Sequence, residues 1–319
     1  MQELKLALAQ EQPRIQAFLE RFVAELPTAS QPVARHVLTA GGKRLRPFLT
    51  LFIGRLFGCR DETLYTLGAA VEILHAATLL HDDILDNADM RRGQPSAHVL
   101  FAPGTVILAG DAMLAKAMLM VSRIGDPRLT DCIAEAAMRT ADGEIAEFNL
   151  LRNPDLSAED YLAVITGKTA WMLRASCELG AIVSGAKPDA IQAAADFGLQ
   201  LGIAFQMVDD ALDFAPGTGK PRGGDLREGK ATPPLLSYIA SLPPAAAAAF
   251  KERFRSGPLS EDEVEALCSA VCAGGHDVRT KEQAGGHLAA VASFLQFFPN
   301  STERMLLEQI QEYILKRDH

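Results

Sequence analysis

Apolar residues recur at helical spacing along nearly the whole chain, and this pattern limits the fold more than any other feature. Between Asp61 and Asp86 they fall, with Thr78 included, at positions 64, 67, 71, 74, 78 and 85. Residues separated by steps of three, four and seven share one face of an α-helix. Nowhere do β-branched and aromatic residues alternate with polar ones over a run, as a strand would require. The sequence therefore predicts an all-α protein.

The same periodicity places the helices along the chain. They are expected at about residues 4–26, 31–40, 47–57, 61–86, 104–121, 126–150, 158–184, 191–214, 260–273, 279–298 and 301–316. Glycine and proline mark the loops, of which residues 215–234 form a long one. Long loops in compact domains are usually functional or disordered, and basic residues in this one favour function. No repeat or clear boundary interrupts the pattern, so a single domain over residues 1–319 is predicted.

The composition bounds the setting in which the chain works. Hydrophobic residues make up 48% of the 319 residues and charged residues 22%, which is enough for a sizeable core. The net charge of −9 disfavours a nucleic-acid partner, because nucleic acid selects a basic face. The five cysteines are odd in number and scattered, which favours a reducing, cytoplasmic location. No apolar stretch is expected to reach the ~18 residues of a membrane span, so any membrane contact is expected to be peripheral.

Two clusters of aspartates carry the strongest functional signal. Asp82, Asp83 and Asp86 form the pattern Asp-Asp-x-x-Asp, and Asp209, Asp210 and Asp213 repeat it 127 residues later. Each cluster lies at the C-terminal end of a long apolar helix, where the helix dipole and the neighbouring acids disfavour carboxylates. A hard divalent cation with oxygen ligands would remove both penalties. One such cluster could as readily be a solvated helix end, but two predict a magnesium site shared by the helix ends.

Magnesium held by few carboxylates keeps positions for water and substrate phosphates, so cations that complement phosphates are expected nearby. Basic residues follow both aspartate clusters and also occupy a glycine-led loop earlier in the chain. They are Lys43, Arg44, Arg46, Arg91, Arg92, Lys168, Lys220 and Lys230. Arginine suits bidentate phosphate contacts, whereas lysine acts as a point charge. His75 and Gln206 share helix faces with the clusters, and each is either a core polar residue or a substrate contact.

The motifs occur in a specific order. They are residues 41–47 (GGKRLRP), 79–86 (LLHDDILD), 90–93 (MRRG), 110–111 (GD), 143–144 (GE), 167–170 (GKTA), 205–213 (FQMVDDALD), 219–221 (GKP) and 224–230 (GDLREGK). This series resembles the polyprenyl synthetase family, the trans-isoprenyl diphosphate synthases, over nearly the whole chain. The resemblance implies an isoprenoid synthase fold, which is a helical bundle around a deep central cavity, in a homodimer.

The implied activity is that of a trans-prenyltransferase. Such an enzyme joins isopentenyl diphosphate head-to-tail (1′-4) to an allylic diphosphate, which can be dimethylallyl, geranyl or farnesyl diphosphate. Diphosphate is released and an all-trans polyprenyl diphosphate forms. By the same resemblance the six aspartates hold Mg²⁺, three ions with substrate bound, which bridge to the allylic diphosphate. The implied partners of that diphosphate are Arg91, Lys168, Lys220 and Lys230. Those of isopentenyl diphosphate are Lys43, Arg46, His75 and Arg92, while Thr169 and Gln206 flank the reacting allylic carbon.

The chain departs from the family pattern in two places. Glu147 stands where Gln is expected in Gly-Glu-x-x-Gln, and residues 232–234 (TPP) replace Thr-x-Pro with an apolar middle residue. Neither change touches the core chemistry, but Glu147 is expected to alter a hydrogen bond near the cavity.

Product length depends on the helix that precedes the first cluster. At ~1.5 Å of rise per residue, Thr78 and Ala77 lie about 6 and 7.5 Å before Asp82, and Leu74 about 12 Å. Short-chain members of the family tend to carry bulky aromatic residues at the positions of Ala77 and Thr78, where this chain has small ones. The sequence therefore resembles the medium- and long-chain types, with products beyond about twenty carbons. Met113, Met118 and Leu119 are candidates for the floor of the cavity.

Several alternatives stay open at this point. A short-chain farnesyl or geranylgeranyl diphosphate synthase would share the same motifs. A terpene cyclase or head-to-head synthase would not need the Lys43–Arg46 loop and Arg92. A non-catalytic partner subunit of a heteromeric synthase can lose acidic clusters, whereas this chain keeps all six aspartates and Lys168. A structural calcium-binding protein would need a loop of alternating oxygen ligands, and none is present in the sequence.

Overall fold

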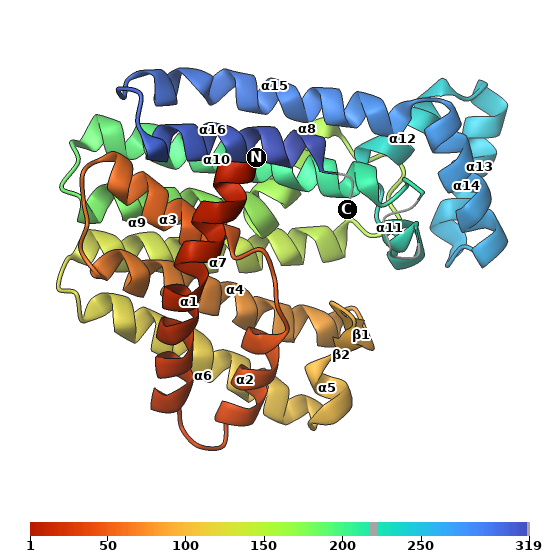
Figure 1. Cartoon of the computed structure of the whole chain (residues 1–319). Coiled ribbons are helices and arrows are strands. Elements are labelled where there is room, and N and C mark those ends of the chain that lie inside the picture. The colour runs from red at the N-terminus through yellow and green to blue at the C-terminus, as the bar shows by residue number, and fades with distance from the viewer. Residues whose placement is uncertain (217–221, 318–319) are drawn as a thin grey trace. The chain divides into compact units, whose positions relative to one another are not determined.

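The computed structural model describes residues 1–216 and 222–317 and is helical almost throughout (Figure 1). The helices are α1 (Gln2–Glu25), α2 (Gln31–Thr39), α3 (Leu45–Leu56), α4 (Thr63–Leu85), α5 (Ala97–Leu100), α6 (Pro103–Ser122), α7 (Pro127–Asn149), α8 (Ala158–Ile165), α9 (Trp171–Val183), α10 (Pro188–Leu212), α11 (Gly224–Glu228), α12 (Pro233–Ser241), α13 (Pro244–Ser256), α14 (Glu261–Ala273), α15 (His276–Gln296) and α16 (Thr302–Lys316). The predicted all-α class is confirmed.

Three local features differ from the sequence-based expectation. A π-helical turn, Thr166–Ala170, separates α8 from α9, where one continuous helix was expected. Two short strands, β1 (Met90–Arg91) and β2 (Gln94–Pro95), pair as an antiparallel hairpin. The long loop after α10 contains the short helix α11, and α12 begins before the loop was expected to end. The π-helical turn, the two strands and α11 each span five residues or fewer, and α12 begins at a proline. Hydrophobic periodicity is therefore a weak signal for all of them.

The chain divides into two compact units. Unit 1 comprises Met1–Ala137, Met172–Gly198 and Phe298–Leu307, and unit 2 comprises Met138–Trp171, Leu199–Phe297 and Glu308–His319. Unit 1 therefore holds α1–α6, the hairpin and the first aspartate cluster, whereas unit 2 holds the π-turn, α11–α15 and the second cluster. The single domain expected over residues 1–319 stays a prediction.

Helix α4 forms the centre of unit 1. It packs chiefly against α6 and α3, and its Leu67, Leu74 and Ala77 are fully buried. Close helix contacts explain two glycines in this unit. A Cβ atom on Gly54 would lie 2.2 Å from Leu64 Cδ2, and one on Gly180 would lie 2.6 Å from the Thr50 carbonyl oxygen. The predicted positions 64, 67, 71 and 74 are buried, whereas Thr78 is half-buried and Leu85 is exposed, and α4 also buries residues on its other sides.

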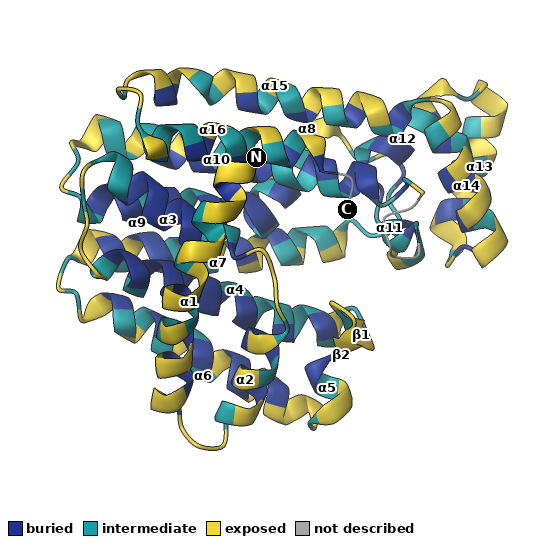
Figure 2. Ribbon diagram, in the orientation of Figure 1, coloured by how far each residue is buried: buried dark blue, intermediate teal, exposed yellow. Residues whose placement is uncertain are grey.

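Unit 2 has a hydrophobic core of its own beyond the second aspartate cluster. Phe214, Leu226, Leu235 and Phe254 are fully buried there, together with Cys268. Helix α15 exposes residues along its outer side and buries others at intervals of four, as Figure 2 shows by alternating colours. The core fixes the chain immediately after Asp213, because Phe214 is part of it.

One expectation about membranes is wrong. Two helices, α4 and α6, are long and apolar enough to cross a membrane by length and composition. The core helix of a soluble protein passes the same test, and the apolar window of α4 is 72% buried inside the protein. The window of α6 is only 33% buried, so its apolar surface needs a separate explanation.

Candidate active site

The first aspartate cluster lies at the C-terminal end of α4 in unit 1. Asp83 is buried, while Asp82 and Asp86 are half-buried on the neighbouring positions of the last turn. The β1–β2 hairpin follows this end of the helix (Figure 1). Arg91 Nε of the hairpin donates a hydrogen bond to Asp83 Oδ1. Asp83 therefore anchors Arg91, whereas Asp82 and Asp86 are the more accessible carboxylates of the cluster.

Positive charge concentrates around His75 in the same unit. Burial lowers the pKa of the half-buried His75 imidazole well below its usual range, and nearby guanidinium groups lower it further. In order of effect, these groups are those of Arg46, Arg92, Arg91 and Arg44. A neutral imidazole among arginines offers donors and positive charge to an anion. Unit 1 thus brings together Arg46, His75 and Arg92, three of the four residues expected to hold isopentenyl diphosphate.

The glycine-led loop before α3 fits closely around Arg92. Arg92 Nη1 donates to the carbonyl oxygen of Gly41, and a Cβ atom on Gly42 would lie 2.6 Å from Arg92 Nη1. Gly42 also has φ +132, a conformation that side chains rarely adopt. Glycine at position 42 therefore allows both the unusual backbone conformation and the close approach of Arg92.

Behind this loop lies a buried ion pair that sequence reasoning missed. Arg44 Nη1 lies 2.6 Å from Glu72 Oε1, with the two side chains 6% and 4% exposed. Arg44 also has φ +48 and donates to the carbonyl oxygen of Leu38. Glu72 lies one turn before His75 on α4, inside an apolar stretch, and a lone charge in such a stretch was the only available signal.

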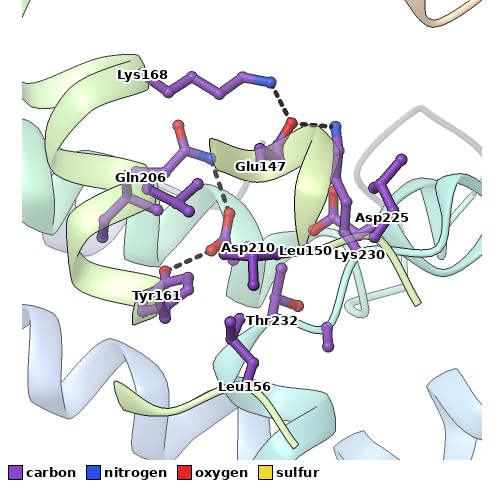
Figure 3. Close-up of a pocket in the computed structure, with 14 residues that line it drawn as sticks. Glu147, Leu150, Leu156, Tyr161, Lys168, Gln206, Asp210, Asp225, Lys230 and Thr232 are labelled. Carbon is purple, nitrogen blue, oxygen red and sulfur yellow. Dashed lines mark hydrogen bonds and ion pairs between the residues drawn. The ribbon is translucent and has the colours of Figure 1, made fainter. Parts of the chain in front are cut away.

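In unit 2, the residues around one pocket form a charged network (Figure 3). Lys168 Nζ lies 2.5 Å from Glu147 Oε2 and 3.0 Å from the Glu144 carboxylate. Lys230 Nζ lies 3.3 Å from the same Glu147 oxygen and 2.5 Å from Glu228 Oε2. Two of the three lysines expected to bind the allylic diphosphate, Lys168 and Lys230, are therefore held side by side.

Local sequence explains how Lys168 reaches this place. It lies in the π-turn between α8 and α9, a wide turn that often marks functional sites. A Cβ atom on Gly143 of α7 would lie 2.3 Å from the Lys168 amide nitrogen and 2.7 Å from Gly167 Cα. The two glycines let α7 and the π-turn approach closely, so Glu144 and Glu147 meet Lys168.

The second aspartate cluster ends α10 in unit 2, and its members have different surroundings. Asp210 accepts hydrogen bonds from the Tyr161 hydroxyl at 2.5 Å and from Gln206 Nε2 at 2.8 Å. Asp213 accepts bonds from the backbone N–H groups of Gly224 and Asp225 at 2.9 and 3.1 Å.

Because Asp210 is buried and both oxygens of Asp213 accept backbone hydrogen bonds, the accessible carboxylate of the cluster is that of Asp209. Its side chain is 44% exposed, and its Oδ1 lies 2.6 Å from Arg317 Nη2. Of the second cluster, Asp209 is therefore the member best placed to meet a cation from solvent.

Burial raises the pKa of two carboxyl groups in this region, those of Asp210 and Asp225. Burial raises the pKa of Asp210 to about 7, although its bonds to Tyr161 and Gln206 act in the opposite direction. Burial, with the charges of Asp210 and Asp213, also raises the pKa of Asp225 well above its ordinary value. Crowded carboxyl groups that resist ionisation are a favourable setting for a hard cation.

The structure brings Thr169 and Gln206 into direct contact, and their expected place beside the reacting carbon stays a prediction. The Thr169 hydroxyl donates to Gln206 Oε1 at 2.8 Å, and Gln206 in turn donates to Asp210. The functional residues that sequence reasoning did not single out in this unit are Tyr161 and Arg317. Neither stands next to a cluster in the sequence, and only folding places them there.

Two predictions about the site remain, one for Lys220 and one for the metal ion. Lys220 lies outside the described residues. Among the parts that the structure describes, no three His, Cys, Asp or Glu side chains gather closely enough to hold a metal ion alone. An all-oxygen donor set nevertheless fits Mg²⁺, which binds through few carboxylates and leaves other positions to phosphates and water. The two clusters belong to different units, so the shared magnesium site stays a prediction.

The positions expected to control product length lie on α4. Leu74 and Ala77 are fully buried, and the hydroxyl of half-buried Thr78 donates to the His75 carbonyl oxygen at 2.9 Å. Helix α6, against which α4 packs most extensively, carries the fully buried Met113 and the exposed Leu119. Of the three candidates for the cavity floor, Met113 is the only one that is fully buried, and Met118 is half-buried.

Comparisons with known proteins agree with this geometry. The polyprenyl synthetase family profile matches residues 28–271. Octaprenyl diphosphate synthase of Escherichia coli is 32% identical over 308 residues, which cover 95% of this chain and 94% of the relative. Geranylgeranyl diphosphate synthase of Sulfolobus acidocaldarius is 38% identical over 228 residues, 68% of each chain.

Solved structures extend the likeness to the whole fold. A decaprenyl diphosphate synthase from Rhodobacter capsulatus superposes with a TM-score of 0.91 at 34% identity, covering 99% of this chain and 98% of its own. A polyprenyl synthase from Caulobacter crescentus, complexed with calcium and isoprenyl diphosphate, gives 0.93 at 32% identity, covering 100% and 98%. The chain therefore belongs to the polyprenyl synthetase family and is a polyprenyl diphosphate synthase, an enzyme that transfers prenyl groups.

Proposed function

We propose that this enzyme condenses isopentenyl diphosphate with an allylic diphosphate, 1′-4 and head-to-tail, to make an all-trans polyprenyl diphosphate of medium or long chain. One observation carries the proposal. A single pocket in unit 2 sets Lys168 and Lys230 beside Asp210 of the second aspartate cluster (Figure 3). Cations for a diphosphate and carboxylates for its divalent cation are thus provided together, as the reaction requires.

The chain's own residues divide the chemistry between them. Lys168, Lys230 and Arg91 would bind the allylic diphosphate and stabilise the negative charge that develops when its C–O bond breaks. Arg46, His75 and Arg92 would hold isopentenyl diphosphate, whose double bond then attacks carbon 1 and forms the new C–C bond. The proton lost from isopentenyl diphosphate would pass to the departed diphosphate, and Thr169 with Gln206 would flank the reacting carbon.

Magnesium completes the proposal. The residues that would hold it are Asp82, Asp86 and Asp209, because these are the more accessible members of the clusters. Asp83, Asp210 and Asp213 would support them through Arg91, Tyr161 and the backbone of α11, respectively. Bound Mg²⁺ would neutralise charge on the leaving diphosphate.

Products beyond about twenty carbons are favoured by the small residues on α4. Ala77 and Thr78 are small, whereas an aromatic side chain at either position would block a product that grows along α4. The likeness to octaprenyl and decaprenyl diphosphate synthases supports this choice, whereas the geranylgeranyl relative keeps a short-chain product as the alternative.

The proposal extends to the assembly and location of the enzyme. We expect a homodimer in the cytoplasm, with membrane contact limited to the apolar product. A non-catalytic subunit of a heteromeric synthase is the less favoured reading, because both lysines and both aspartate clusters are retained.

The first experiment is to incubate the purified chain with Mg²⁺, labelled isopentenyl diphosphate and farnesyl diphosphate, and then to size the products. We expect a series of products that ends beyond twenty carbons. A series that stops at fifteen or twenty carbons would keep the reaction and reject the length assignment. No incorporation with any allylic primer, by folded and Mg²⁺-supplied protein, would reject the catalytic proposal.

A matched pair of variants locates the activity. Asp209→Asn removes an accessible carboxylate of the second cluster and should reduce kcat by at least about a hundredfold, as removal of one preorganised electrostatic group can. Asp126→Asn removes an aspartate of the loop before α7, paired with Arg128, and should leave the rate unchanged. Equal losses in both variants would indicate a general loss of structure.

A further inference from the structure

Glu147 occupies a central position in the charged network of unit 2. One of its oxygens, Oε2, lies 2.5 Å from Lys168 Nζ and 3.3 Å from Lys230 Nζ, so a single carboxylate bridges both lysines. Figure 3 shows the two ammonium groups converging on it. The side chains of Glu147, Lys168 and Lys230 are 19%, 22% and 15% exposed, so solvent screens these contacts only in part.

The network carries more negative than positive charge. Lys168 and Lys230 contribute two positive charges, and Glu144, Glu147 and Glu228 lie in ion-pair contact with them and contribute three negative charges. Burial pushes the pKa of Glu147 upward, but Lys230 and Lys168 outweigh it and hold the pKa below its ordinary value. The pKa of Lys230 is raised, because its carboxylate neighbours outweigh burial. All three groups of the bridge are therefore ionised near neutral pH.

This arrangement opposes the binding of a bare anion. A diphosphate that contacts either ammonium group comes within reach of the Glu147 charge, and the lysines are already neutralised by carboxylates. A neutral amide at residue 147 would lower the negative charges in the network from three to two. A divalent cation that arrives with the diphosphate would act in the same direction, because its positive charge would offset that of Glu147.

We propose that Glu147 is a specificity-determining residue that makes diphosphate binding at Lys168 and Lys230 depend on a divalent cation. The enzyme would thereby reject metal-free diphosphates and accept those that carry Mg²⁺. This inference rests on the proposed function, since it takes Lys168 and Lys230 as the diphosphate site. It also gives a role to the one departure from Gly-Glu-x-x-Gln that the sequence shows.

Glu228 provides a matched comparison within the same network. It pairs with Lys230 at 2.5 Å, but its side chain is 41% exposed. Replacing Glu228 by glutamine changes the charge of the chain as much as replacing Glu147, at a site that water screens better. A difference in pyrophosphate affinity between the two variants therefore reports where the charge lies and not the net charge of the chain.

The test is calorimetric binding of inorganic pyrophosphate to the full-length enzyme, once with Mg²⁺ and once with EDTA. For Glu147→Gln we expect the metal-free Kd to fall about tenfold, because a partly buried unit charge is removed beside the anion. The Kd with Mg²⁺ should change by less than about threefold, so the ratio of metal-free to Mg²⁺ affinity should shrink. Glu147→Asp keeps the charge and should keep the wild-type ratio, and Glu228→Gln should change that ratio by less than about twofold.

Three results would overturn the inference. They are an unchanged or weaker metal-free Kd in Glu147→Gln, an equal effect in Glu228→Gln, and a Glu147→Asp variant that behaves like Glu147→Gln. Thermal unfolding of each variant checks that it is folded. If Glu147→Gln does not fold, the pyrophosphate affinities of Glu147→Asp test the inference instead. Failure of the proposed function would look different: the wild type would bind Mg²⁺-pyrophosphate but incorporate no isopentenyl diphosphate. A wild type that binds pyrophosphate under neither condition would overturn both.

Discussion

Arg44 and Glu72 form an ion pair that is almost completely removed from water. Their side chains are 6% and 4% exposed, and Glu72 Oε2 has no hydrogen-bond partner among the described residues. A buried pair of this kind contributes little net stability over an apolar pair, but loss of one partner leaves an uncompensated buried charge. Because Arg44 lies between Lys43 and Arg46, the pair also fixes the loop that presents these cations. The ion pair therefore serves the enzyme by holding this loop in place more than by adding stability.

Replacing Glu72 by glutamine should cost about 3 kcal/mol of unfolding free energy, since the Arg44 charge stays buried without its counter-ion. The KM for isopentenyl diphosphate should rise more than kcat falls, because the loop that holds Lys43 and Arg46 loosens. Urea unfolding and steady-state kinetics measure the two effects. The control is Glu312→Gln, which breaks an exposed pair with Lys316 and should change stability by less than about 0.5 kcal/mol. Equal changes in both variants would contradict the role given to burial.

At this scale the sequence predicts the residues that carry charge in a recognisable order and misses those that support them. Asp82, Asp209 and Lys168 stand in motifs whose spacing has a physical reason. Glu72 and Tyr161 have no such spacing, because each meets its partner only after the chain has folded. The roles of the motif residues in catalysis stay predictions.

The contact between α7 and the π-turn is the structural element that organises the pocket of unit 2. It depends on the absence of side chains at two positions, since a Cβ atom on Gly143 would lie 2.3 Å from the Lys168 amide nitrogen. Backbone atoms cannot move aside as the end of a flexible side chain can. The position of Lys168 relative to Glu144 and Glu147 is therefore set by how closely the two segments approach.

Gly143→Ala should separate these segments and destabilise the protein by about 1–3 kcal/mol, the usual cost of overpacking. Product formation should fall with it, because Lys168 moves away from the pocket. Gly286→Ala is the matched control: it lies inside α15 with nothing within 4 Å of its Cβ position, so alanine should stabilise by up to about 1 kcal/mol. Thermal unfolding measures the change in stability of both variants, and product assays measure the change in activity. A stable and fully active Gly143→Ala variant would show that the close approach is dispensable.

Among the elements, the long helices were predictable and the interruptions were not. Helices α4 and α10 are buried over most of their surface, and their apolar residues recur at helical spacing in the sequence. The π-turn keeps the same apolar pattern on both sides, so nothing in the sequence separates α8 from α9. The apolar character of α6 was underestimated, because small and polar residues such as Gly110 and Asp111 dilute a stretch that is otherwise long enough to span a membrane.

For the whole molecule, the exposed face of α6 is the feature that most needs a partner. Leu108 and Leu119 are 68% and 44% exposed, and with exposed Ala115 they recur at intervals of seven and four on one face. These residues flank the exposed carboxylate of Asp111, and exposed apolar side chains that gather on one helix face mark an interaction site. Because most soluble oligomers are symmetric homo-oligomers, a second copy of the chain is the simplest cover for the α6 face.

Leu108→Glu should therefore convert a dimer into a monomer, because it places a charge in the middle of a surface that a second copy would bury. Light scattering should give the wild type twice the 34.3 kDa mass of one chain and the variant that mass itself. Leu6→Glu changes a singly exposed leucine of α1, 57% exposed, and should leave the dimer intact. A wild type that is monomeric, or dimeric regardless of Leu108, would mean that α6 does not form the interface. A wild type that stays in solution only with detergent or lipid would instead assign the α6 face to a membrane surface.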